Sequence, residues 1–346
     1  MQYASPLIAV LLTAVFGLLL CVAAGRNPWA ALYTFTISPV STLYGVSELL
    51  IKAAPLILIA VGLAIGFQAN VWNIGAEGQL TIGAIFSGGL ALHVASDGVL
   101  LLPAMIIAGA VGGMVWAALP ALLRTRFNAN EILVSLMLNY VAQLWLSYLI
   151  YGPWRDPQGF NFPQSKPLVA DALYPILVPG TRLNAGVLIV LVAVIVGWFV
   201  LKRTFVGFQL RVTGLAEPAA RYAGFSTTRA IWIGMLAGGA AAGLAGVGEV
   251  AGPLGQLFPT ASPGYGYAAI IVAFLGRLSP IGILFSGLFM SLLYLSGEAA
   301  QIELNLPSAT TGLFQGALLF MLLAADLLVN YTIVVAPARR LQEKIS

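Results

Sequence analysis

Long runs of apolar residues, separated by short polar or Gly- and Pro-rich stretches, dominate the chain and predict membrane-spanning helices. A helix needs about 20 apolar residues to cross roughly 30 Å of hydrocarbon, because every backbone polar group must be paired inside the membrane. The eighth run is too short to cross alone and is expected to begin within the membrane or to extend into the stretch before it. The pattern predicts an all-α fold, a polytopic transmembrane helical bundle of about ten spans. The runs are residues 5–24, 46–66, 80–96, 100–122, 131–151, 185–202, 228–250, 265–276, 281–298 and 312–330.

The composition indicates that lipid, rather than water, covers most of the surface. Of the 346 residues, 60% are hydrophobic and 8% are charged, whereas about a quarter of the residues in a soluble domain are charged. No stretch between the runs is long enough to fold by itself, so residues 1–346 are expected to form a single transmembrane domain. We predict a multi-pass protein of the cell membrane.

Several kinds of chemistry are excluded by what the sequence lacks. One cysteine, Cys21, and one histidine, His93, exclude an internal disulfide, a cysteine metal cluster and a two-histidine metal site. The P-loop motif G-x-x-x-x-G-K-[ST] is absent, and so are HExxH and G-x-S-x-G. The net charge of +4 is too small and too dispersed for nucleic-acid binding. We therefore expect no metal, no cofactor and no enzymatic activity, so energy for transport must come from an ion gradient or another subunit.

The positions of Lys and Arg predict the orientation, because cytoplasmic segments carry an excess of these residues. With both termini in the cytoplasm, five basic residues lie on the external side and eleven on the cytoplasmic side. This arrangement places the Pro- and aromatic-rich loop 152–184 outside and the basic loop 201–229 inside. The aromatic residues of the 152–184 loop either lie at the level of the lipid headgroups or dock an external partner. The cytoplasmic set is Arg124, Arg126, Lys202, Arg203, Arg211, Arg221, Arg229, Arg277, Arg339, Arg340 and Lys344.

A polar segment, VWNIGAEGQL at residues 71–80, joins the second and third runs. Asn73, Glu77 and Gln79 offer donors and acceptors suited to a polar, uncharged solute, although a solvated loop before a helix fits the pattern equally well. Asn139 is a further candidate, since an amide inside an apolar span needs a partner.

Two acids beside the membrane also stand out. Glu48 lies one helical turn from Lys52 and is expected either to pair with it or to face the solute. Glu249 follows a run in which small residues recur every four positions, a pattern that favours close helix packing over a substrate role. An acid at such a boundary either reaches water or marks a pathway.

Residues 214–224 predict a short helix within the basic loop. Pro218 stands where a first helical residue would, and Gly224 follows the expected end. So short a helix is marginal alone in water, so it must lie against lipid, the rest of the chain or a partner protein.

Four segments in this order resemble the permease subunits of bacterial ABC importers of the nucleoside and simple-sugar type, a group that includes ribose and branched-chain amino acid permeases. They are WNIGAEGQ (72–79), NANEILVSLMLNY (128–140), GLAEPAARYAGFS (214–226) and GYGYAAIIVAFLGRLSP (264–280). The first two resemble the nucleoside-type branch most.

The resemblance implies that the chain forms the path for a nucleoside or similar polar solute, with a simple sugar as the alternative. It implies cytoplasmic ABC ATPase subunits, a second permease subunit, which is the same or homologous, and an extracytoplasmic solute-binding protein. Residues 214–224 would then be the coupling helix, with contact surface offered by small and aromatic side chains and orientation by charged ones. Candidate pathway residues are Asn73, Glu77, Gln79 and Asn139, and candidate coupling residues are Glu217, Ala219, Ala220, Arg221, Tyr222 and Gly224.

An ion-coupled secondary transporter is the competing hypothesis from the residues alone. It requires an acid deep in the membrane, for which Glu298 and Asp326 are the candidates, and it gains nothing from the basic loop 201–229. A membrane enzyme is a third class, which no motif supports.

Overall fold

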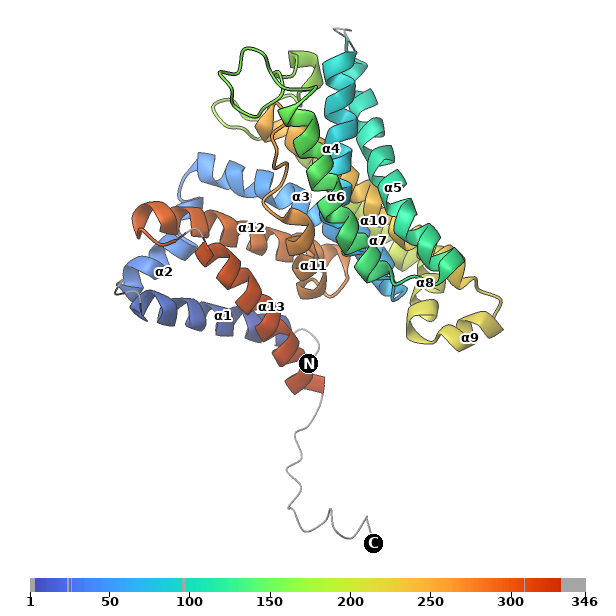
Figure 1. Ribbon diagram of the computed structural model, residues 1–346. Coiled ribbons are helices and arrows are strands. Elements are labelled where there is room, and N and C mark those ends of the chain that lie inside the picture. The colour runs from blue at the N-terminus through green and yellow to red at the C-terminus, as the bar shows by residue number, and fades with distance from the viewer. Residues whose placement is uncertain (1–3, 24, 26, 95–97, 308, 331–346) are drawn as a thin grey trace, which may run out of the picture.

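The chain folds as an all-α protein, shown as a computed structural model in Figure 1. The structure describes residues 4–23, 25, 27–94, 98–307 and 309–330. Within these ranges it has thirteen α-helices and no β-strand, apart from two isolated bridges in the 152–184 loop. The helices are α1 (Ala4–Ala23), α2 (Pro28–Thr36), α3 (Leu43–Gln68), α4 (Ala76–His93), α5 (Leu101–Phe127), α6 (Glu131–Tyr151), α7 (Gly186–Arg203), α8 (Phe205–Leu215), α9 (Glu217–Tyr222), α10 (Thr227–Glu249), α11 (Tyr265–Leu275), α12 (Pro280–Glu303) and α13 (Ala309–Asn330), with the 3-10 turns η1 (Ser38–Val40) and η2 (Ala170–Ala172) and the π-helix η3 (Val250–Leu254).

Six of the described helices are long and apolar enough to cross a membrane. The predicted all-helical class is confirmed by the thirteen α-helices of the described residues. The short eighth run forms the 11-residue α11. Each predicted run lies on a helix, but the number of about ten spans stays a prediction. The six are Leu43–Gln68, Leu101–Phe127, Glu131–Tyr151, Gly186–Arg203, Thr227–Leu254 and Pro280–Glu303.

Two helices, α2 and α8, lie where the apolar pattern predicted only connecting segments. Each begins at a polar cap: the Trp29 N–H donates to the Asn27 side chain at 2.9 Å, and the Gly207 N–H donates to the Thr204 hydroxyl at 3.2 Å. The segment 201–229 thus contains α8 in addition to the short helix predicted at 214–224. At 9 and 11 residues, α2 and α8 are too short for a search based on membrane-length runs to detect.

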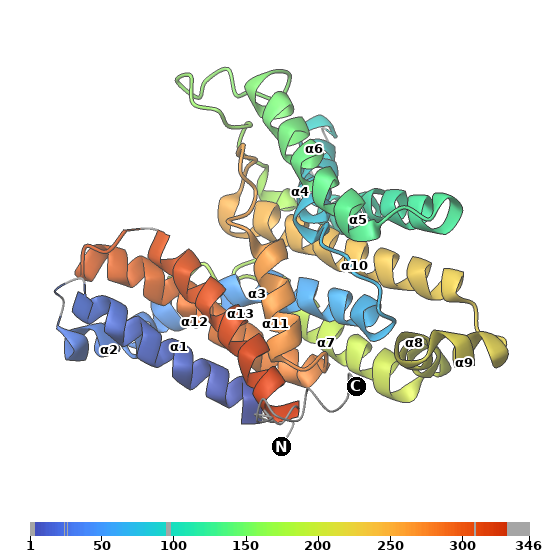
Figure 2. The same ribbon diagram turned by 60° about the horizontal axis from the view of Figure 1, so that its bottom comes forward.

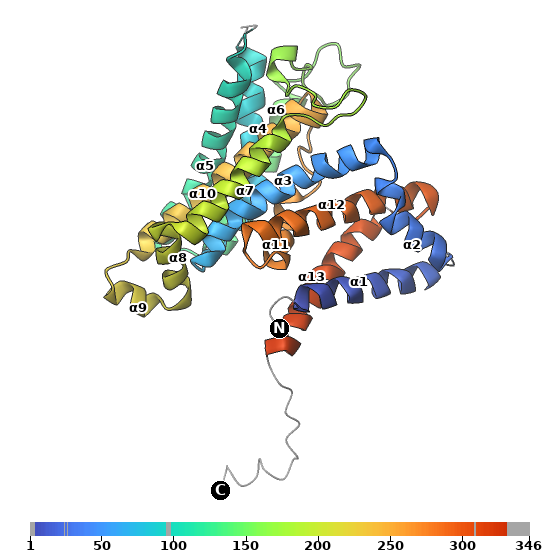
Figure 3. The same ribbon diagram turned by 180° about the vertical axis from the view of Figure 1, so that it is seen from behind.

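Two groups of helices meet at α3 (Figures 1 and 3). Helices α4, α5, α6, α7 and α10 lie together on one side, and α1, α2, α12 and α13 lie on the other. α3 packs against α10 and α7 of the first group and against α12 of the second, while α11 packs on α3, α4 and α12. As a result, α3 is the most buried of the six long apolar helices.

The ends of the molecule differ in what they carry. The 152–184 loop lies at one end of the first helix group, and the α8–α9 pair projects at the opposite end (Figure 1). α1 and α13 lie side by side and run antiparallel, so the start of α1 and the end of α13 lie at the same end (Figure 2).

Small residues allow α10 to approach its neighbours closely, as the sequence predicted. A Cβ atom on Gly243 would collide with the backbone of Gly109 in α5, and one on Gly234 would lie 2.7 Å from the Cα of Gly66 in α3. Side chains at these positions would push the helices apart. The packing interpretation of this small-residue face is confirmed.

Candidate functional site

Asn73 and Gln79 form a closed pair of amides at the turn before α4. The Asn73 Nδ2 donates to Gln79 Oε1 at 2.9 Å, and the Gln79 Nε2 donates to Asn73 Oδ1 at 3.0 Å. The Gly75 N–H also donates to Asn73 Oδ1 at 3.0 Å, and both side chains are buried. This pair therefore fixes the turn, and its amides are satisfied within the protein.

Asn139 of α6 connects this turn to two other helices. Its Oδ1 accepts from the Gly78 N–H at 2.8 Å, and its Nδ2 donates to the Ile74 carbonyl at 2.9 Å and to the Tyr267 hydroxyl at 3.0 Å. The expectation that this amide needs a partner inside the membrane is confirmed. Asn139 holds α6, the start of α4 and the start of α11 together.

Glu77, in the first turn of α4, binds the beginning of α11. Its Oε2 accepts from the Gly266 N–H at 2.7 Å. A carboxylate is favoured there, because the first N–H groups of a helix have no partner within the helix. The structure thus brings all four candidate pathway residues into one region, where each bonds the protein itself.

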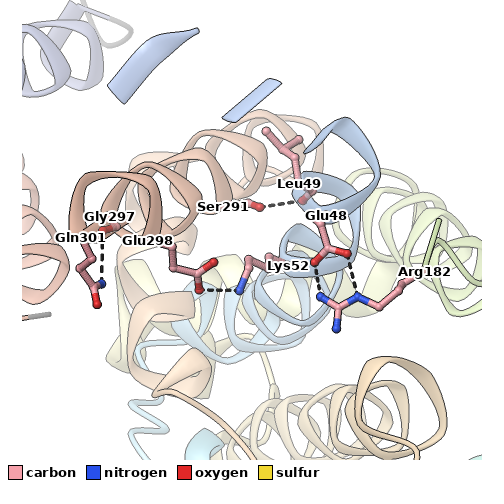
Figure 4. A network of polar contacts seen from close by, with 8 residues as sticks. All are labelled: Glu48, Leu49, Lys52, Arg182, Ser291, Gly297, Glu298 and Gln301. Carbon is pink, nitrogen blue, oxygen red and sulfur yellow. Dashed lines mark hydrogen bonds and ion pairs between the residues drawn. The ribbon is translucent and has the colours of Figure 1, made fainter. Parts of the chain in front are cut away.

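Two ion pairs extend from the opposite end of α3 to different elements (Figure 4). The Arg182 Nε and Nη2 donate to the two oxygens of Glu48 at 2.8 and 2.5 Å, and the Lys52 Nζ donates to Glu298 Oε1 at 2.8 Å. The predicted pairing of Glu48 with Lys52 is wrong, because each faces a nearer partner on another segment. The bonds from Glu48 hold the pKa of Arg182 above its ordinary value.

These pairs also bear on the candidates for ion coupling. Glu298 is bound to Lys52 and half of its side chain is exposed, so it is not an isolated acid deep in the membrane. The side chain of Asp326 lies outside the part that the structure describes.

A cavity of about 490 Å³ lies beside the ion pairs, next to the first half of α3. We call it the Glu249 cavity. Its volume is within the range of about 300–1,000 Å³ that is typical of small-molecule sites. The apolar pattern and the motifs do not predict a cavity, although the sequence indicates Glu48 and Glu249 as separate candidates. Its charged and aromatic lining residues are Glu48, Lys52, Arg182, Glu249 and Tyr265.

The 152–184 loop packs over the segment that lines this cavity. The N–H groups of Ser165, Leu168 and Tyr174 donate to carbonyls of residues 251–257, each at 2.9 Å. Phe160 is 94% exposed, but Tyr174 is buried, so Tyr174 belongs neither to a headgroup belt nor to a docking surface. Burial raises the pKa of the Tyr174 hydroxyl to about 12.

Helix α9 confirms the short helix predicted within 214–224. Gly224 follows it with φ of +79°, a conformation that favours glycine, and donates its N–H to the Arg221 carbonyl at 3.0 Å. The Arg221 side chain bonds Glu217 within the same helix at 2.6 Å.

The two faces of α9 differ sharply in exposure. Ala220 is completely buried, which corrects the expectation that it offers contact surface to a partner. Ala219 is exposed, and Tyr222 is 97% exposed. Any partner must therefore approach through the Ala219 and Tyr222 side.

The α8–α9 pair is held against the membrane helices at the end of α3. Phe205 and Phe208 of α8 pack on Phe225 with ring centroids 5.8 and 6.1 Å apart. A Cβ atom on Gly214 would collide with the Gln68 carbonyl at the end of α3. The pair therefore contacts the end of α3, which leads into the turn that contains Asn73.

Comparison with known proteins places these features in context. The model of a family described as branched-chain amino acid transport system / permease component matches residues 45–323. A glucose ABC transporter permease protein of Haloferax volcanii is 35% identical, over 98% of this chain and 92% of the relative. A guanosine ABC transporter permease protein of Bacillus subtilis is 30% identical, over 88% of each chain. A nucleoside ABC transporter permease protein of Lactococcus lactis is 29% identical, over 92% of this chain and 89% of the relative. No solved structure matches significantly.

Proposed function

Since the chain belongs to the permease components of the branched-chain amino acid transport system family, we propose that it works in an ATP-driven importer, with ATP hydrolysed on separate cytoplasmic ABC ATPase subunits. Similarity to ABC permeases over nearly the whole length is the observation that carries this proposal. The protein is a multi-pass permease of the cell membrane, in line with its six long apolar helices. Both termini are cytoplasmic and about ten segments cross or enter the membrane.

The α8–α9 pair couples the permease to the ATPase. Three features support this role: α9 projects from the bundle, presents Tyr222 to solvent and lies at the end opposite the 152–184 loop. The tight contact between Gly214 and the end of α3 gives a route by which ATPase movement reaches the membrane helices.

The solute is a nucleoside or a similar polar, uncharged molecule, as the names of the relatives from Bacillus subtilis and Lactococcus lactis suggest. A simple sugar is the second candidate, favoured by the 35% identity to the glucose permease protein. The solute arrives on an extracytoplasmic binding protein that docks at the 152–184 end, and it passes between two permease subunits. Asn73, Glu77, Gln79 and Asn139 border this path.

ATP-dependent uptake of radiolabelled adenosine and glucose by proteoliposomes tests the proposal. The liposomes contain the permease with its cognate ATPase and binding protein. Tyr222→Asp should abolish co-purification with the ATPase and uptake, because it places a charge on the exposed face of α9 while the membrane core stays folded. Phe160→Asp, equally exposed at the opposite end, should still co-purify with the ATPase. Uptake driven by an ion gradient without ATP would instead make the protein a secondary transporter.

A further inference from the structure

Glu249 is a buried acid to which no described residue binds directly. Its side chain is 7% exposed at the last residue of α10. Among the residues that the structure describes, none donates a hydrogen bond to its carboxylate or forms an ion pair with it. Buried polar groups are normally hydrogen-bonded, because leaving them unpaired costs free energy. The carboxyl group lines the wall of the cavity, where a bound solute can supply the hydrogen bonds that the described residues do not.

The backbone after Glu249 places this acid on the wall of the Glu249 cavity. α10 ends here and continues as the π-helix η3, within which Gly252 leaves helical geometry. Such π segments are frequent at functional sites. Pro253 and Leu254 of η3 line the cavity together with Glu249, so the change in helix type brings the acid to the cavity surface.

The neighbouring charges leave Glu249 as the available acceptor. Lys52 and Arg182 also line the cavity, but Glu298 and Glu48 already bind them directly. The charged lining consists of two acids and two bases, so a solute with a net charge gains nothing from it. The hydroxyl-bearing residues Thr260, Ser262 and Tyr265 complete a polar wall.

We propose that the Glu249 carboxylate binds two adjacent hydroxyl groups of an uncharged solute in this cavity. A carboxylate has two acceptor oxygens and can accept from two neighbouring donors at once, and hydrogen bonds to charged groups are stronger than neutral ones. A vicinal diol is the shared chemistry of a ribonucleoside and a sugar. This inference rests on the proposed function and assigns the solute-recognition residue.

Thermal unfolding of the purified permease, with millimolar adenosine, 2′,3′-dideoxyadenosine or glucose, tests the inference directly. Adenosine or glucose should raise the unfolding midpoint of the wild type, and the dideoxynucleoside, which lacks the diol, should not. Glu249→Gln should weaken diol binding about tenfold or more, because it removes two charge-assisted hydrogen bonds. Which of the two diols stabilises the protein distinguishes the nucleoside from the sugar.

The unliganded variants separate solute binding from a structural role. Glu249→Gln should unfold at the same or a higher temperature than the wild type, because no described residue forms a hydrogen bond or an ion pair with Glu249 that the substitution would break. A lower midpoint would assign Glu249 to the fold and overturn the inference. Glu303→Gln is the matched control: Glu303 bonds Thr34 and Ser38 and does not line the cavity, so the variant should bind like the wild type.

Glu249→Asp keeps the carboxylate but withdraws it by one methylene, and it should bind the diol more strongly than the Gln variant and less strongly than the wild type. Equal binding of adenosine and its dideoxy analogue by the wild type, or no binding while uptake is intact, would overturn the inference alone. Absence of ATP-dependent uptake of either solute by the wild type would instead overturn the proposed function.

Discussion

At the residue scale, two buried amides that bond each other are costly to separate, because removing one leaves the other without its partner. Replacing Gln79 with Leu removes both bonds to Asn73, at a cost of about 1–3 kcal/mol. We expect Gln79→Leu to lower the thermal unfolding midpoint of the purified permease, whereas Gln158→Leu in the exposed loop leaves it unchanged. If Gln79→Leu keeps the wild-type midpoint yet fails to transport, Gln79 acts on the solute rather than on the fold.

The buried hydroxyl of Tyr174 predicts a pH effect. Burial raises its folded pKa to about 12 from the ordinary tyrosine value of 10.0, so the folded state holds a proton that the unfolded state loses first. The stability that this proton contributes is complete below pH 10 and is lost as the pH rises towards 12. Tyr174→Phe should abolish the fall in folding stability that this hydroxyl causes between pH 10 and pH 12.

At neutral pH the same variant has a second expected outcome. The Tyr174 hydroxyl is buried and has no hydrogen-bond partner among the residues that the structure describes, so Tyr174→Phe should be neutral or slightly stabilising when unfolding is followed by circular dichroism. A clear destabilisation would show that the hydroxyl has a partner in the membrane.

At the scale of elements, the close approach of α10 to α5 depends on the absence of side chains. A methyl on Gly243 would strike the Gly109 backbone, whereas a methyl on Gly248 of the same helix would meet no atom within 4 Å. Gly243→Ala should therefore destabilise by about 1–3 kcal/mol, and Gly248→Ala should not, since alanine favours helix. Thermal unfolding of the two variants measures the difference, and equal midpoints would show that the α10–α5 contact is looser.

Local sequence signals were sufficient to predict where α9 begins and ends, but not which of its sides is buried. Pro218 and Gly224 mark the ends of α9 in the sequence, and the helix forms between them because its limits are set by backbone chemistry. Its buried side, with Ala220, depends on packing against α8 and α10. A six-residue helix has no hydrophobic periodicity long enough to reveal that side.

At the scale of the whole molecule, the charge distribution predicts that the 152–184 loop and α9 lie on opposite sides of the membrane. In a Cys21→Ala background, we expect cysteine at Gln158 to react with an impermeant thiol reagent in intact cells. Cysteine at Ala219, which is also exposed, should react only after the membrane is permeabilised. The reverse labelling would invert the orientation.

The sequence by itself determined the class of the protein and much of its local order. A chain with 8% charged residues cannot solvate a globule of this size, so membrane helices follow from composition and run length. The small-residue face of α10 and the end signals of α9 likewise depend only on neighbours within one helix, and both were predicted.

Only the tertiary structure decided the partners of the polar residues. Glu48 and Lys52 are one turn apart, yet they bind Arg182 and Glu298, which are distant in the chain. The sequence predicts Asn73, Gln79 and Asn139 as residues of the solute pathway, but their bonds within the protein depend on where the turn before α4 meets α6. The Glu249 cavity exists because α3, η3 and the 152–184 loop converge. Pairing and cavities are set by distances between segments, and a local pattern does not contain those distances.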